Sequence, residues 1–199
     1  MGSEFIHGLL VGLAFIVAIG PQNAFVLKSG LLRQHIFTVC FICAASDALL
    51  IVSGIAGLDR LLVEFPVLLD VFRYGGATFL LFYGFASARS AWKGGAALKA
   101  QGQQESYKNA VLICLALTWL NPHVYLDTVI LLSSIALQSE TPFLFGAGAM
   151  SGSFLFFFSL GYGARFLAPV FQNPQSWRIL DLVICLIMWS IAVQLLFFS

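Results

Sequence analysis

Charged residues are scarce in this chain: they make up only 10% of its 199 residues and leave a net charge of +1. There is no basic tract, so nothing points to a nucleic-acid partner. Hydrophobic residues account for 60%, whereas soluble domains average roughly 45–50% apolar and about 25% charged residues. The composition therefore predicts an integral membrane protein whose main partner is the lipid bilayer.

The start of the chain lacks the marks of a signal peptide. No basic segment precedes the first apolar run, and that run continues past the length of a signal sequence. The first residues, MGSEF, match what two common cloning sites encode, so residues 1–5 are interpreted as a vector remnant. Glu4 accordingly carries no functional argument.

Cysteine is also rare, and its placement argues against most cysteine chemistry. The four cysteines all lie in apolar stretches: Cys40, Cys43, Cys114 and Cys185. The first two have the spacing of a redox CxxC motif, but such a motif needs an exposed helix N-terminus that activates a thiol. We interpret all four as small buried hydrophobes, and we expect neither a metal site nor a cofactor.

Six apolar runs are long enough, at about 20 residues, to cross a membrane as helices. They cover residues 5–27, 36–58, 67–91, 109–134, 143–167 and 177–198. Runs of this length are too long to be barrel strands. The predicted fold class is therefore an all-α membrane protein with six transmembrane helices.

The distribution of lysine and arginine predicts the orientation. The loops after the first, third and fifth runs share one side of the membrane and carry eight of these residues: Lys28, Arg33, Arg89, Lys93, Lys99, Lys108, Arg165 and Arg178. Only Arg60 and Arg73 fall on the other side. Because positively charged loops stay in the cytoplasm, we expect both termini to lie outside and the segment between the third and fourth runs to lie in the cytoplasm.

The positions of two prolines indicate an internal repeat in the sequence. Pro21 in AIGPQNAFVL and Pro122 in TWLNPHVYLD occupy matching places in the first and fourth runs. Residues 6–92 and 109–199 then form two three-helix repeats joined by a cytoplasmic linker of residues 93–108, and an odd number of helices gives the repeats opposite orientations. Interrupted helices in inverted repeats indicate the binding site of a transporter. Proline is also common in membrane helices without such a role, but two matched prolines, each followed by polar residues, favour the transporter.

Each proline should end one half-helix and start another, because it removes a backbone donor and clashes with the preceding turn. Asn121 is expected to cap the helix that begins at Pro122, and Gly20 precedes Pro21 in the same way. The new helix N-termini would direct backbone amides into the membrane, where their partial positive charge suits a carboxylate ligand. These amides belong to Gln22, Asn23, His123 and Val124.

Two acids accompany the breaks. Asp47 falls at the middle of the second run, and Asp127 lies four residues after His123, on the same helix face. Ionisable residues at this depth usually mark substrate or proton pathways, and no lysine or arginine near the centre of a run could neutralise Asp47. Tyr125 is a further candidate for the wall of the site. Helix N-termini for a carboxylate and aspartates for a cation together match a basic amino acid.

Export of a cation also predicts how the transport is driven. Moving one positive charge outward against the membrane potential costs roughly 2.3 kcal/mol per 100 mV. Exchange for an incoming proton removes this electrical cost. Since an aspartate can hold either the proton or the substrate cation, we expect proton antiport through competition for one site.

At these residues the sequence resembles the LysE-type amino-acid exporter family. The matching segments are GPQNAFVL, Ser46-Asp47, YGF at 83–85, TWLNPHVYLDT and FLAP at 166–169, spread over essentially the whole chain. The resemblance implies an inner-membrane exporter of arginine, with lysine or toxic analogues as further substrates. It also implies that the family's intramembrane acids are Asp47 and Asp127. Other members export neutral amino acids, so a neutral substrate is the alternative.

Some features allow more than one interpretation. Two pairs of glycines at four-residue spacing permit close helix packing, either within the bundle or in a homodimer: Gly8 with Gly12, and Gly148 with Gly152. Two acid–base pairs three residues apart are expected to form salt bridges near helix ends, with alternating gates as the other interpretation: Asp70 with Arg73, and Arg178 with Asp181.

Two other functions fit parts of the pattern. A membrane thiol-disulfide carrier can also be built from inverted three-helix halves, but it should carry cysteines beside both breaks. Here the first run has none, and Cys114 lies eight residues before Pro122. A passive channel would show a flux that ignores the proton gradient.

Overall fold

A computed structural model of the chain describes residues 2–17, 20–58, 66–94 and 106–197. Within these ranges every regular element is a helix, which confirms the predicted all-α class. Most of the predicted linker, together with Arg60 and Lys99, lies outside the described residues.

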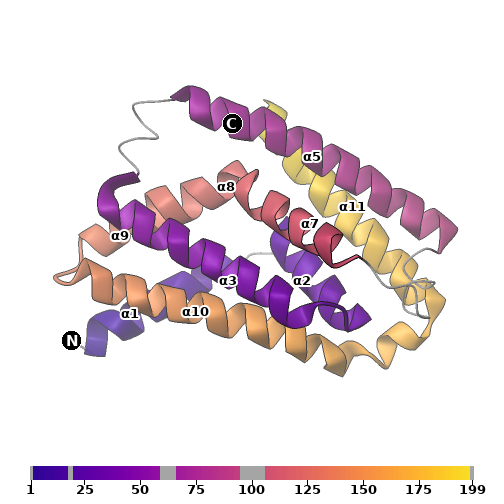
Figure 1. The fold of residues 1–199 in the computed structure, drawn as a ribbon, viewed down its shortest axis with the longest axis horizontal. Coiled ribbons are helices and arrows are strands. Elements are labelled where there is room, and N and C mark those ends of the chain that lie inside the picture. The colour runs from indigo at the N-terminus through magenta and orange to yellow at the C-terminus, as the bar shows by residue number, and fades with distance from the viewer. Residues whose placement is uncertain (1, 18–19, 59–65, 95–105, 198–199) are drawn as a thin grey trace.

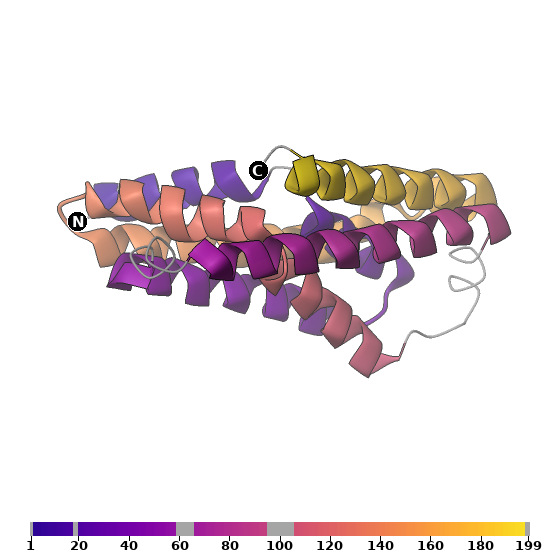
Figure 2. The same ribbon diagram turned by 90° about the horizontal axis from the view of Figure 1, so that it is seen from above.

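The helices follow one another along the chain with two sharp breaks (Figure 1). In order they are α1 Gly2–Ile16, α2 Pro21–Leu32, α3 Ile36–Ser53, the π-helix η1 Gly54–Leu58, α5 Pro66–Lys93, α7 Tyr107–Trp119, α8 Pro122–Val124, the π-helix η2 Tyr125–Leu132, α9 Ser133–Leu137, α10 Pro142–Gly163, the 3₁₀ turns η3 Ala164–Leu167 and η4 Val170–Gln172, and α11 Pro174–Phe197. Two views show α5 and α11 lying side by side, with the start of α1 at one end of the molecule and the end of α11 near its middle (Figures 1 and 2).

Three of these helices are long and apolar enough to cross a membrane: Ile36–Gly57, Pro142–Leu167 and Pro174–Phe197. The number rises to five when each broken pair, Gly2–Ile16 with Pro21–Leu32 and Tyr107–Trp119 with Pro122–Leu137, is counted as one span. The remaining predicted span coincides with α5, which has 28 residues but carries charges near both ends and is not among the five. The six-span topology, the inverted repeat and the orientation stay predictions.

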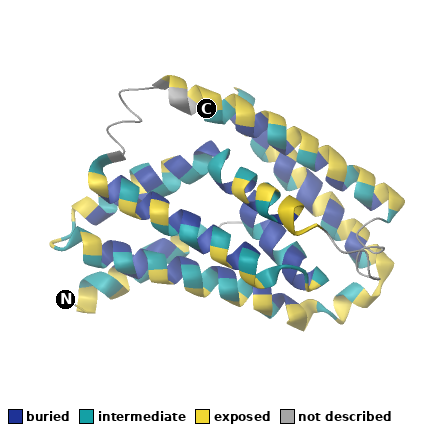
Figure 3. Ribbon diagram, in the orientation of Figure 1, coloured by how far each residue is buried: buried dark blue, intermediate teal, exposed yellow. Residues whose placement is uncertain are grey.

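Large apolar side chains cover much of the outside of the bundle. Phe82, Leu155 and Leu186 are among those that are more than half exposed, and exposed residues follow the outer faces of the long helices (Figure 3). A soluble protein rarely exposes extended apolar surface. These faces therefore suit the hydrocarbon interior of a bilayer.

Both predicted helix breaks are present. The axes of α1 and α2 differ by 85°, and those of Tyr107–Trp119 and Pro122–Leu137 by 56°. Pro21 and Pro122 each start the second half-helix, and an extended residue precedes each of them, Gly20 and Asn121. Proline produces this arrangement because its missing N–H costs nothing at the first position of a helix.

The paired glycines pack α1 against α10. A Cβ atom at Gly8 would overlap the backbone of Phe145, and one at Gly148 would overlap the backbone of Phe5. The other two pair members, Gly12 and Gly152, also face the opposite helix. The glycines thus serve packing within the bundle, and they no longer provide support for a homodimer.

The two ion pairs expected within single helices are not found among the described residues. Asp181 is fully buried and pairs instead with Lys28 of α2, with 2.5 Å between Nζ and Oδ1. Arg178 is exposed and forms no ion pair with a described residue. Arg73 donates to the carbonyl oxygens of Leu195 and Leu196 and thereby satisfies the C-terminal end of α11. The spacing of residues along one helix predicts contacts within that helix only, so it could not predict that Asp181 and Arg73 find their partners on other helices.

Candidate functional site

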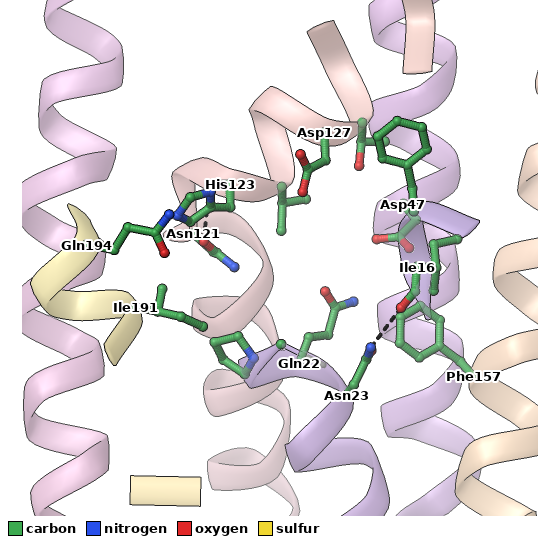
Figure 4. Close-up of a pocket in the computed structure, with 15 residues that line it drawn as sticks. Ile16, Gln22, Asn23, Asp47, Asn121, His123, Asp127, Phe157, Ile191 and Gln194 are labelled. Carbon is green, nitrogen blue, oxygen red and sulfur yellow. Dashed lines mark hydrogen bonds between the residues drawn. The ribbon is translucent and has the colours of Figure 1, made fainter. Parts of the chain in front are cut away.

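A cavity of about 360 Å³ lies where the two helix breaks meet. Its wall combines the first turn of α2, the middle of α3, α8 with the start of η2, and parts of α1, α10 and α11 (Figure 4). The lining residues are Phe15, Ile16, Gly20, Pro21, Gln22, Asn23, Asp47, Asn121, His123, Val124, Asp127, Thr128, Phe157, Ile191 and Gln194. Its volume falls within the range of small-molecule sites, about 300–1,000 Å³.

Most residues that the sequence assigned to the site line this cavity. Asp47 and Asp127 face it from α3 and η2, and His123 faces it from α8 (Figure 4). Gln22 and Asn23 face it from α2. Residues about a hundred positions apart thus meet because both breaks lie at the same depth in the bundle. Tyr125 and Pro122 are not among the lining residues.

Acidic side chains line the cavity. Asp47 is 5% exposed, and its Oδ2 accepts a hydrogen bond of 2.8 Å from the Ser153 hydroxyl on α10. Asp127 is partly buried. No lysine or arginine is among the residues that line the cavity. A cation that entered would therefore meet two carboxylates, and the one other titratable side chain in the lining is His123, beside Asp127.

Two nitrogen atoms of the cavity residues have no hydrogen-bond partner within the described part of the protein. These are Nε2 of Gln22 and Nε2 of His123, and both atoms are buried. The Gln22 side chain nevertheless lies close enough to Asp47 and Cys43 to interact with both. Leaving a buried polar atom without a partner costs free energy. A ligand that supplied acceptor oxygens to them would recover that free energy.

A side chain closes each helix break. The amide of Asn23 donates a 2.8 Å hydrogen bond to the carbonyl oxygen of Ile16 at the end of α1. The hydroxyl of Tyr125 donates a 2.8 Å hydrogen bond to the carbonyl oxygen of Trp119 at the end of α7. Each half-helix thus satisfies a C-terminal carbonyl of the half-helix before it, which a membrane interior requires.

The second break does not offer the free amides that the sequence led us to expect. The side chain of Asn121 accepts from the amide of His123, and the amide of Val124 donates to the carbonyl oxygen of Asn121. The expectation of an anion site at these two amides is therefore wrong. Asparagine is an effective cap, and its own oxygen takes the place of a ligand. In α2, by contrast, Gly20 provides no side-chain cap.

The environment of Tyr125 favours a structural role over the predicted role in the site. Its ring is stacked on Phe72 of α5, with centroids 4.6 Å apart, and its hydroxyl is bonded to Trp119. We expect Tyr125→Phe to retain transport and to lower the free energy of unfolding by about 1 kcal/mol, the contribution of one hydrogen bond. Transport assays and chemical unfolding of the purified protein check this. If Tyr125→Phe lost transport while its free energy of unfolding stayed unchanged, Tyr125 would have a direct role in the site.

The sequence interpretation missed several lining residues. Phe15, Ile16, Phe157 and Ile191 are apolar, and nothing in their spacing distinguishes them from lipid-facing neighbours. Gln194 did leave a signal, since it is an isolated amide within the apolar helix α11. A polar side chain with so few polar neighbours along its helix needs a partner inside the bundle.

The cysteines lie in the core rather than in the cavity, which confirms their interpretation as buried hydrophobes. All four are at most 3% exposed. The Sγ atoms of Cys43 and Cys114 are 3.3 Å apart, and Cys40 donates to the carbonyl oxygen of Phe157. The described residues contain no group of three His, Cys, Asp or Glu side chains that could hold a metal ion.

Comparison with known proteins decides the family, because the LysE type translocator family matches residues 13–199. The chain belongs to the LysE type translocator family. The resemblance seen in the motifs is thereby confirmed. As a member of this family, the chain is a transporter and not an enzyme, and its several apolar helices make it a multi-pass membrane protein.

Relatives of this LysE type translocator match over nearly its full length. It is 41% identical to the Arginine exporter protein ArgO of Klebsiella pneumoniae (strain 342) over 198 residues, which cover 98% of this chain and 94% of that protein. The same figures hold for the Arginine exporter protein ArgO of Escherichia coli (strain K12). The Putative amino-acid transporter Mb0498 of Mycobacterium bovis is 40% identical over 181 residues, which cover 90% of each chain. No solved structure matches the chain significantly.

Proposed function

We propose that this LysE type translocator exports L-arginine from the cytoplasm across the bacterial inner membrane, with lysine or toxic analogues as further substrates. One observation carries the proposal: Asp47 and Asp127 line the same cavity, and no lysine or arginine lines it with them. The relatives that are named arginine exporters and cover nearly the whole chain support the same substrate.

The two aspartates suit the cationic side chain of a basic amino acid. A guanidinium group carries several donors in a planar fork and pairs well with carboxylates. Asp47 is the more buried of the two and already accepts from Ser153, which fixes the direction of its carboxylate. We assign the substrate cation to the space between Asp47 and Asp127.

We assign the α-carboxylate of the substrate to donors that lie beside the two aspartates, His123 near Asp127 and Gln22 near Asp47. The unpartnered nitrogens of Gln22 and His123 can each donate to its oxygens when they carry hydrogen. The N-terminus of α2, which has no side-chain cap and also lines the cavity, adds partial positive charge. Asn23 and Asn121 hold the two breaks in place, so we assign them to positioning rather than to direct recognition.

We further propose that transport is coupled to protons. Each aspartate can hold either a proton or the substrate cation, so loading one releases the other. Exchange of one proton for one monovalent cation moves no net charge, and the membrane potential then does not oppose export. The protonation sites would be Asp47, Asp127 or both.

Arginine efflux from reconstituted vesicles tests the proposal. Vesicles loaded with radiolabelled arginine are diluted into medium of equal or lower pH, with and without a protonophore. We expect faster efflux into the acidic medium and loss of this acceleration with the protonophore, since a one-unit pH difference supplies about 1.4 kcal/mol per exchanged proton. Arginine efflux that ignores the gradient would contradict antiport and favour a passive channel. No arginine efflux under any condition would contradict the proposed substrate.

A further inference from the structure

A second buried ionic cluster lies outside the cavity. Lys28 of α2 and Asp181 of α11 form an ion pair of 2.5 Å, and the hydroxyl of Ser90 on α5 donates a 2.6 Å hydrogen bond to the other oxygen of Asp181. Asp181 has no exposed surface, and the side chain of Lys28 is only 13% exposed. The cluster thus joins three helices through one carboxylate.

The cluster stands next to the cavity along the direction of transport. Lys28 follows the cavity residue Gln22 by six positions, or about 9 Å along α2. Asp181 precedes Ile191 of the cavity by ten positions on α11, or about 15 Å. Both views place α2, the end of α5 and the start of α11 in the same half of the molecule (Figures 1 and 2). On the charge distribution this is the cytoplasmic half.

The ion pair ties α2 to α11 on this side of the cavity, so any movement that separates these two helices breaks it. Withdrawal of Lys28 leaves the carboxylate of Asp181 buried without a cation, which is strongly unfavourable. A substrate with its own cationic group can take the place of Lys28, whereas a neutral amino acid cannot. A guanidinium group could in addition reach both oxygens of the carboxylate.

We propose that Asp181, with Ser90, is a second cation-binding site for the substrate on the route to the cavity, held by Lys28 while that route is closed. The proposal rests on the proposed function. The guanidinium or ammonium group of a basic amino acid displaces Lys28 as α2 moves. Selection against neutral amino acids therefore begins at this cluster, before the substrate reaches Asp47 and Asp127.

The competing interpretation is that the cluster only ties the helices together. Both interpretations predict that a lone Asp181 is harmful, so single neutralising variants do not separate them. The double variant Lys28→Met with Asp181→Asn removes both charges and leaves no buried ion. Ser87→Ala, a buried serine one turn away on α5, serves as the matched control.

The test compares arginine with citrulline, its neutral isostere, in flux from reconstituted vesicles and in equilibrium binding to the purified protein. For the double variant we expect the arginine-to-citrulline flux ratio to fall at least tenfold, while arginine affinity at the cavity stays within threefold of the unchanged protein. Ser87→Ala should leave both values unchanged. If the folded double variant kept the arginine-to-citrulline flux ratio of the unchanged protein, the cluster would only hold the helices together and would not bind substrate. No arginine flux in the unchanged protein would instead refute the proposed function.

A second variant covers the case in which the double variant does not fold. Lys28→Arg keeps the charge and the pairing, but its guanidinium holds Asp181 more firmly and competes better with incoming substrate. We expect the KM for arginine at this face to rise at least threefold while the Kd of the cavity is unchanged. An unaltered KM would contradict displacement of residue 28 by the substrate.

Discussion

Replacing Asp47 with asparagine is expected to reduce arginine transport at least about 30-fold, because a buried cation that loses its charged partner costs 2–5 kcal/mol. Asp47 is 5% exposed, so little water can replace the missing charge. The fold should survive, since asparagine has the same shape and its carbonyl oxygen still accepts from Ser153. Measured initial rates and thermal unfolding of the same preparation separate the two effects.

Two matched variants sharpen this result. Asp70→Asn makes the same chemical change at an exposed position of α5 that does not line the cavity, and it should leave transport within twofold. Asp127→Asn should give a smaller loss than Asp47→Asn, because Asp127 is less buried and water can compensate part of its charge. Retained transport in both cavity variants would remove the aspartates from the mechanism.

The helix breaks could be predicted from the sequence because their cause is local. Proline acts on its own backbone and on the turn before it, so Pro21 and Pro122 identified both breaks without any knowledge of the fold. The matching positions of the two prolines then indicated that the breaks meet. The acids Asp47 and Asp127 could be found for a similar reason, since a carboxylate within an apolar run is conspicuous on its own.

Features that depend on contacts between helices could not be predicted in this way. The sequence paired Asp181 with Arg178 on the same helix, whereas its partner, Lys28, lies 153 positions away. The amides of His123 and Val124 were expected to be free, but Asn121 satisfies them. The π-helix from Tyr125 to Leu132 also left no signal, because apolar residues fit either helical period. At the end of this π-helix the Ser133 hydroxyl donates a hydrogen bond to the carbonyl oxygen of Thr128, five residues earlier in the chain.

Gly76→Ala is expected to destabilise the protein and to impair arginine binding, whereas Gly75→Ala on the same helix should be harmless. A Cβ atom at Gly76 would overlap the carbonyl oxygen of Leu120, at the end of α7, and would approach Pro122. A backbone atom cannot escape by changing a rotamer, and overpacking of this kind costs roughly 1–3 kcal/mol. At Gly75 a Cβ atom would meet nothing within 4 Å, and alanine should stabilise the helix by up to about 1 kcal/mol.

The comparison of these adjacent glycines tests more than local packing. Leu120 directly precedes Asn121, so α5 can move away from Leu120 only if the break that carries Asn121 and His123 shifts with it or loses its support. We therefore expect the Kd for arginine to rise in Gly76→Ala together with the fall in the free energy of unfolding, both measured on the purified protein. If Gly76→Ala lost stability but bound arginine as well as Gly75→Ala, the position of the break would not control the cavity, and α5 would act as a support for the fold alone.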